Sequence, residues 1–150
     1  MTILKQIGII LLAAAVLAAV SNLIHPRSIP WTQDWSYQVE ERAQEEGIRI
    51  VSLAMARESD AVFIDARTER EFREGHIPDA VSVPLVTWEE HFQMLVEQID
   101  AGREMIVYCS GRRCDDALLL ANNLQRLGAD VALMVDGFEG WVAAGGEVEP

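Results

Sequence analysis

The chain has 150 residues, half of them apolar, and a formal net charge of -12. This length allows one domain with a buried core and makes a second domain improbable. An acidic surface repels phosphate backbones, so we expect no nucleic-acid partner.

The first predicted element is an uncharged segment near the N-terminus, residues 7–24, which reads IGIILLAAAVLAAVSNLI. Its length matches a bilayer core, and residues 1–25 are therefore predicted to be a transmembrane anchor. A signal peptide is the alternative, but the apolar run is long and no small-residue cleavage site closes it. Lys5 lies before the run and Arg27 after it, a slight positive-inside bias that places the domain on the periplasmic or extracytoplasmic side.

Residues 26–47 are predicted to be a linker and a spacer helix. Pro26 and Pro30 stop the apolar helix. Two placements stay open for the tryptophans that follow, Trp31 and Trp35: the membrane headgroup region or the surface of the domain. Ser36–Glu46 is polar and helix-prone, and we expect it to act as a spacer or lid, outside the core.

Residues 48–150 are predicted to form the domain, in which strands alternate with helices. Such an alternation predicts an α/β fold with a mostly parallel central sheet and helices on both faces. The expected strands are residues 48–51, 61–65, 80–83, 105–109 and 130–135. The expected helices begin at an N-cap on Ser52, at capping boxes Thr68/Glu71 and Thr87/Glu90 (the latter opening a helix to about Asp100), and at residues 115 and 138.

Chemistry is expected where the fourth strand ends. Cys109 stands at the carboxyl end of MIVYC, the position where open α/β sheets bind ligands. The residues that follow, Ser110, Gly111, Arg112, Arg113 and Cys114, form a tight turn before a helix. Backbone N–H groups there, together with the two arginines, favour an anion or a thiolate. The alternative is a buried structural cysteine with two solvated arginines.

Four ordered segments resemble the successive motifs of the rhodanese family of sulfurtransferases. They are FIDART followed by Glu71 and Phe72, GHIPDAVSVPL, IVYCSGRRC and DGFEGW, and together they span about residues 48–148. The resemblance implies a rhodanese fold in which Cys109 carries a sulfane sulfur as a persulfide. Residues 110–114 match the family's active-site loop, whose amides surround that sulfur.

The resemblance also implies roles outside the loop. Asp65 and Arg67 match a structural pair beneath it, and His76 lies in a turn motif, where it supports the fold rather than catalysis. Cys114 stands at a position often filled by Ser or Thr, so it is either inert or a resolving cysteine that closes a disulfide with Cys109.

The expected activity is transfer of a sulfane sulfur from thiosulfate or a persulfide donor to a thiol or another thiophilic acceptor. No metal and no organic cofactor is expected, and no protein partner can be named. Two alternatives remain: a non-catalytic module tethered to the membrane, and a thiol-disulfide switch formed by Cys109 and Cys114. A cysteine phosphatase or arsenate reductase is disfavoured, because the arginine that a phosphate loop needs six positions after the cysteine is replaced by Asp115.

Overall fold

The computed structural model describes residues 3–24 and 38–150 of the chain. They fall into two units, helix α1 and a compact unit that begins at helix α2, and each is treated separately. The predictions made for Pro26, Arg27, Pro30, Trp31 and Trp35 lie outside the described residues.

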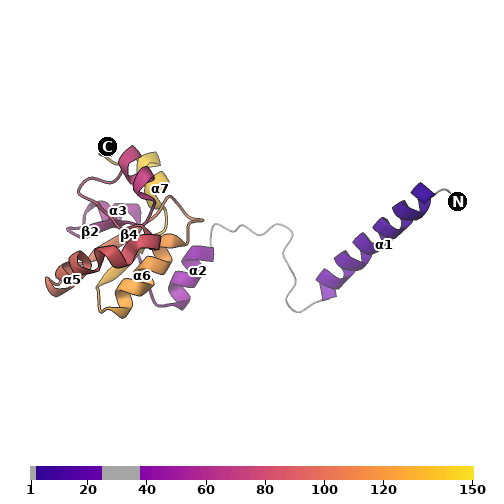
Figure 1. Cartoon of the computed structure of the whole chain (residues 1–150), viewed down its shortest axis with the longest axis horizontal. Helices are drawn as coiled ribbons and strands as arrows, with labels where there is room; N and C mark the ends of the chain where they lie inside the picture. The colour runs from indigo at the N-terminus through magenta and orange to yellow at the C-terminus, as the bar shows by residue number, and fades with distance from the viewer. Residues whose placement is uncertain (1–2, 25–37) are drawn as a thin grey trace. The chain divides into compact units, whose positions relative to one another are not determined.

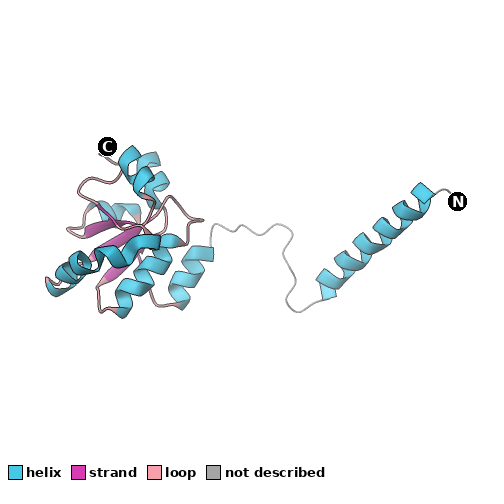
Figure 2. Ribbon diagram, viewed as in Figure 1, coloured by secondary structure: helices cyan, strands magenta, loops and turns pink. Residues whose placement is uncertain are grey.

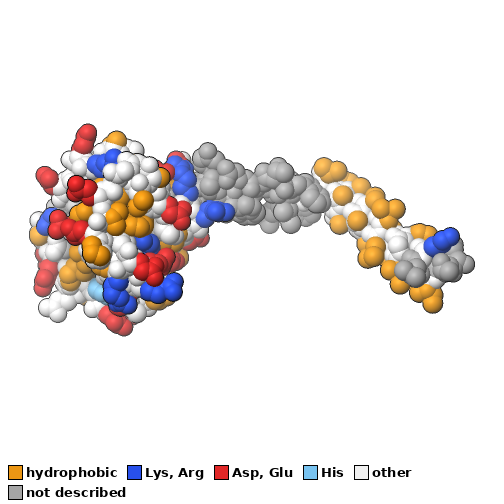
Figure 3. All heavy atoms as spheres, turned by 90° about the horizontal axis from the view of Figure 1, so that it is seen from above, with side chains coloured by type: hydrophobic (Ala, Val, Ile, Leu, Met, Phe, Trp, Pro, Cys, Tyr) orange, Lys and Arg blue, Asp and Glu red, His pale blue; other side chains and the backbone are white. Residues whose placement is uncertain are grey.

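Helix α1 (Ile3–Ile24) is apolar along its length, as the space-filling view shows (Figure 3). Within it, Lys5–Ile24 has a mean hydropathy of 2.5, and none of this span is buried against other parts of the protein. Among the described residues it is the one helix long and apolar enough to cross a membrane. A signal sequence has the same properties, so the membrane anchor remains a prediction.

The compact unit is built on a five-stranded sheet in the order β1-β5-β4-β2-β3. Every pairing between these strands is parallel, which confirms the predicted sheet. Each predicted strand appears, shortened at its ends. The strands are β1 (Arg49–Ile50), β2 (Val62–Asp65), β3 (Val81–Ser82), β4 (Met105–Tyr108) and β5 (Val131–Met134).

Helices cover both faces of this sheet, as predicted (Figures 1 and 2). One face packs against α2, α5 and α6, and the other against α3 and α7. Strands β4 and β5 are consequently buried along their whole length. The helices are α2 (Gln38–Glu45), α3 (Leu53–Arg57), α4 (Glu69–Glu74), α5 (Phe92–Asp100), α6 (Asp116–Arg126) and α7 (Gly137–Ala143), with a 3-10 segment η2 at Leu85–His91.

Two of the three predicted side-chain caps are confirmed, and the helices expected at residues 115 and 138 begin at Asp116 and Gly137. The Ser52 hydroxyl accepts a hydrogen bond from the Met55 N–H at 3.3 Å, and Thr68 and Glu71 form a reciprocal capping box. The capping box predicted at Thr87 does not open α5, which begins at Phe92 with His91 at its N-cap and ends at Asp100, the predicted end. Thr87 lies at a kink inside the 3-10 segment, with φ -125° and ψ 16°, and its N–H donates to the Pro84 carbonyl.

Helix α2 belongs to the core of the compact unit. Its Val39 and Ala43 are 3% and 0% exposed and pack with the large cluster on one face of the sheet. The Ala43 carbonyl also accepts a hydrogen bond from the Ile48 N–H at 2.8 Å, which turns the chain from α2 into β1. The folded unit therefore starts earlier than residue 48, and α2 is more than a spacer.

Truncation of Val39 tests this placement. We expect Val39→Ala to lower the free energy of unfolding by about 2 kcal/mol, because two buried methyl groups are lost and a small cavity remains. Glu41→Ala, at an exposed position of the same helix, is the matched control and should change it by less than about 0.5 kcal/mol. Equal stability of the two variants in urea unfolding would contradict a structural role for α2.

Candidate active site

The site begins where strand β4 ends. This strand lies between β2 and β5 in the middle of the sheet, and Cys109 follows its last residue. Cys109 is 4% exposed, and its Sγ lies 3.9 Å from the Ser110 hydroxyl. The neighbouring strands β2 and β5 thus fix Cys109 at the carboxyl edge of the sheet, the position that the sequence predicted.

The loop of residues 110–114 brings Cys114 back to Cys109, and a disulfide joins the two cysteines in this structure. The Cys114 N–H donates to the Gly111 carbonyl at 3.0 Å, closing a turn. The two Cα atoms lie 6.1 Å apart, inside the range usual for disulfides. The loop therefore brings the second sulfur directly onto the first.

A buried ion pair lies beneath the loop. Arg67 donates to both carboxylate oxygens of Asp65, with an Nη2–Oδ2 distance of 2.6 Å, and both side chains are almost wholly buried. The same guanidinium donates to the Gly75 carbonyl at 2.8 Å and lies 4.0 Å above the Phe138 ring. Removing one partner of such a pair costs about 3–5 kcal/mol, because the other charge stays buried. These contacts fit the supporting role expected for Asp65 and Arg67.

Helix α7 holds the first half of the loop. The Phe138 and Glu139 N–H groups donate to the carbonyls of Cys109 and Ser110, each at 2.8 Å. Gly137 makes this contact possible: a Cβ there would lie 2.5 Å from the Cys109 carbonyl oxygen and 2.7 Å from the Gly111 nitrogen. Its φ of +62° also favours glycine.

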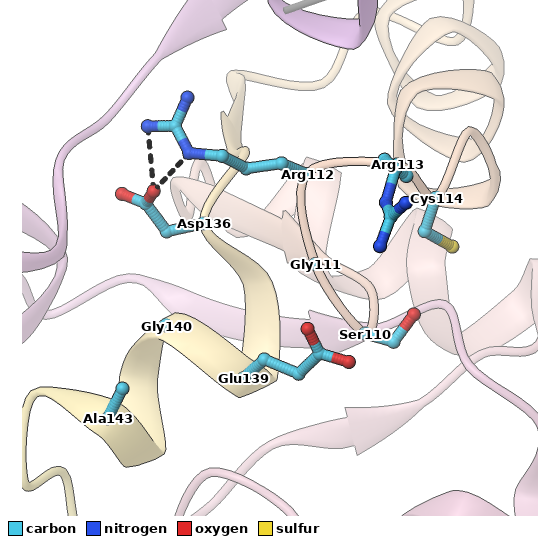
Figure 4. A pocket seen from close by; sticks show the side chains of 9 residues that line it. All are labelled: Ser110, Gly111, Arg112, Arg113, Cys114, Asp136, Glu139, Gly140 and Ala143. Atoms are coloured by element: carbon cyan, nitrogen blue, oxygen red, sulfur yellow. Dashed lines mark hydrogen bonds and ion pairs between the residues drawn. The ribbon is translucent and has the colours of Figure 1, made fainter. Parts of the chain in front are cut away.

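The loop opens onto a cleft of about 620 Å³ lined by residues of the loop and of α7. Figure 4 shows Arg112 directed toward Asp136, to which its Nε donates at 2.8 Å. Arg112 also pairs with Glu40 of α2 at 3.3 Å, so much of its positive charge is offset. Glu139 lines the same cleft, with its carboxylate beside Gly111.

Helix α2 reaches the far end of the loop as well. Arg42 pairs with Asp115 at 2.7 Å, directly after Cys114. Sequence reasoning did not anticipate these contacts of Glu40 and Arg42, or that of Glu139. Little in the sequence indicates these contacts, because charged residues on a short helix usually face water.

Two further groups are candidates for catalysis or metal binding. The His76 ring stacks on Phe72, its Nδ1 lies 3.0 Å from the Phe72 carbonyl oxygen, and its Nε2 lies 4.0 Å from the Glu149 carboxylate, contacts that fit a role in the fold. The Asp116 carboxylate lies within 4.8 Å of both cysteine sulfurs. Burial, and then the negative charges of Asp115 and Glu71, raise the pKa of Asp116. With both sulfurs in a disulfide, these three groups do not offer the ligand set of a zinc site.

The comparison with protein families agrees with this geometry. The family model described as "Rhodanese-like domain" matches residues 51–144. This range covers more than half of the chain and contains β2, β4, the Cys109 loop and α7. The chain therefore belongs to the rhodanese-like domain family, as the sequence motifs indicated.

The individual relatives either align with only part of this chain or share little sequence identity with it. The tRNA uridine(34) hydroxylase of Pectobacterium carotovorum is 40% identical over 67 residues, which are 43% of this chain and 19% of that protein. A Rhodopseudomonas palustris protein of unknown function, titled a possible tyrosine phosphatase, is 26% identical with a TM-score of 0.55, covering 81% of this chain and 99% of the other. The thiosulfate sulfurtransferase of Pseudomonas aeruginosa is 24% identical with a TM-score of 0.52, covering 77% of this chain and 22% of the other, and shows the fold alone.

Gly137 offers a test of the loop geometry. We expect Gly137→Ala to displace the Cys109 carbonyl and the Gly111 nitrogen and to destabilise the protein by several kcal/mol, on the order of the cost of overpacking plus backbone strain. Gly145→Ala is the matched control, because Gly145 has a similar φ of +73° and nothing lies within 4 Å of its Cβ position. The Gly145→Ala variant should lose only about 1–2 kcal/mol of its free energy of unfolding, which is the penalty of the left-handed conformation. Thermal unfolding of both variants measures the difference, and equal losses would contradict the described contact.

Proposed function

We propose that this protein is a sulfurtransferase that carries a sulfane sulfur on Cys109 as a persulfide. The observation that carries the proposal is the position of Cys109: it ends the central buried strand and begins a tight loop fixed by α7. Membership of the rhodanese-like family supports it. No step requires a metal or an organic cofactor.

The chemistry is a double displacement. The Cys109 thiolate attacks the outer sulfur of the donor, a new sulfur–sulfur bond forms, and the bond to the rest of the donor breaks. From thiosulfate the leaving group is sulfite; from an organic persulfide it is a thiolate. A thiophilic acceptor then attacks the outer sulfur of the Cys109 persulfide and restores the Cys109 thiolate. The disulfide with Cys114 must be reduced before the first step.

The charges of the cleft bear on the choice of donor. Asp136 and Glu139 line it with two carboxylates, Arg112 is already paired with Asp136 and Glu40, and Arg113 adds one further positive charge. The cleft therefore attracts a dianion such as thiosulfate less strongly than the presence of two arginines in the sequence suggested. We infer that an organic persulfide is a better donor than thiosulfate, and that a phosphate ester is a poor ligand.

The hydroxylase activity of the tRNA-modifying relatives is not carried over to this chain. It belongs to proteins of which the chain covers 19%. The net charge of -12 also opposes binding to RNA.

Exchange of each cysteine tests the sulfurtransferase. Full-length protein in detergent, reduced and freed of reductant, should convert thiosulfate and cyanide into thiocyanate. We expect Cys109→Ser to abolish this transfer because the nucleophile is gone. Cys114→Ser is the matched cysteine-to-serine control and should retain measurable transfer.

Full activity in folded Cys109→Ser would overturn the assignment. Folded wild-type protein that accepts sulfur neither from thiosulfate nor from an organic persulfide would leave the non-catalytic binding module as the better description. Circular dichroism of each variant establishes that it is folded.

We further propose that helix α1 anchors the protein in a membrane, with the compact unit on the extracytoplasmic side. Its apolar span supports the anchor, and Lys5 at the N-terminal end of that span supports the orientation. The full-length chain should stay with membranes through a high-salt wash, and protease should digest the compact unit in right-side-out vesicles but spare it in inverted ones. Release as a soluble chain with a shortened N-terminus would instead identify a signal peptide, and protection in right-side-out vesicles would reverse the orientation.

A further inference from the structure

We propose that Cys114 gives the site a second activity: it resolves the Cys109 persulfide, releases hydrosulfide and leaves the Cys109–Cys114 disulfide, which a dithiol reductant then opens. The inference rests on the proposed function of Cys109. It adds a reductive outcome for the bound sulfur and a chemical class of partner, a dithiol.

The closed loop is the observation that carries this inference. The two sulfurs are bonded in the structure, and the turn closed by the Cys114 N–H and the Gly111 carbonyl lies between them in the chain. A thiol held this close to a persulfide has a large advantage over an acceptor that must diffuse to a buried sulfur. Cys109 is 4% exposed, so external acceptors meet a narrow approach.

The reaction balances without an external oxidant. The Cys114 thiolate attacks Sγ of the protonated persulfide Cys109–S–SH. The bond between the two Sγ atoms forms, the bond from Cys109 Sγ to the outer sulfur breaks, and that sulfur leaves as HS⁻ with its proton. The sulfane sulfur is reduced by two electrons, and the cysteine pair is oxidised by the same two.

Regeneration follows from the unequal exposure of the two sulfurs. Cys114 lines the cleft and is partly exposed, whereas Cys109 is buried. A dithiol therefore attacks Cys114 Sγ, Cys109 leaves as the thiolate, and the second thiol of the reductant attacks the mixed disulfide on Cys114. The net reaction converts one sulfane sulfur and one dithiol into one hydrosulfide and one disulfide.

The test uses full-length protein in detergent, reduced and then freed of thiols. Thiosulfate is added, and aliquots are quenched with monobromobimane so that sulfite and sulfide are measured separately. Sulfite reports loading of Cys109, and sulfide reports resolution. We expect wild-type protein to release equal amounts of both and to end as the intramolecular disulfide by intact mass, whereas Cys114→Ser and Cys114→Ala release sulfite, lose the sulfide and keep the added sulfur.

Each other outcome has a defined meaning. Sulfite without sulfide from the wild-type protein, with a persistent persulfide, overturns the resolving role and leaves the sulfurtransferase standing. The same assay is run with an organic persulfide as donor, and failure of wild type and variants to take up sulfur from either donor overturns the sulfurtransferase, and the resolving role with it. The wild-type readout does not depend on the folding of any variant.

Protein concentration supplies a second check. The rate constant of sulfide release should not change on dilution, because the attacking thiol belongs to the same chain. A rate that rises in proportion to protein concentration would show attack by a second molecule and would overturn the proposal.

Discussion

The buried ion pair between Asp65 and Arg67 is the interaction on which the rest of the site depends. Two charges removed from water are tolerated only when each is fully hydrogen-bonded by its partner. Arg67, just beyond the end of β2, meets this condition and also donates from Nη2 to the Gly75 carbonyl. Its guanidinium also lies over the Phe138 ring, one residue from Gly137. The Arg67 side chain therefore links the carboxyl end of β2 to the start of α7.

The cysteine loop is held from two directions that differ in strength. On one side, α7 donates main-chain hydrogen bonds to the carbonyls of Cys109 and Ser110, and Gly137 permits close approach. On the other side, α2 contributes exposed ion pairs to Arg112 and Asp115, each worth less than about 1 kcal/mol. The Cys109 limb is thus held by main-chain hydrogen bonds from α7, whereas the Cys114 limb is held by the turn to Gly111 and by side-chain ion pairs, including that of Arg112 with Asp136.

The proposed cycle requires two arrangements of this loop. A Cys109 persulfide needs room for an additional sulfur atom, whereas the disulfide holds Cys114 at bonding distance. The acidic groups at the cleft, Asp136 and Glu139, meanwhile reduce its attraction for dianions.

Sequence patterns predicted much of this architecture. Periodicity and turn residues predicted five strands, the parallel sheet and most helices, because the central strands β4 and β5 are buried on both faces and read as apolar runs. Four ordered motifs predicted the family. The position of Cys109 could be predicted as well, because the end of an apolar strand is visible in the local sequence. The sequence analysis misjudged Thr87, where a polar residue followed by Glu90 imitates a capping box, although Pro84 directs the chain into a 3-10 turn.

The sequence by itself determined the apolar N-terminal helix, the α/β class, the rhodanese resemblance and the pairing options of two cysteines five residues apart. Tertiary structure alone decided that α2 is part of the core, that Arg112 is paired with Asp136 and Glu40, and that Glu139 stands at the cleft. These contacts join residues far apart in the chain. Whether a charge faces water or a partner depends on how distant elements pack, which no local pattern records.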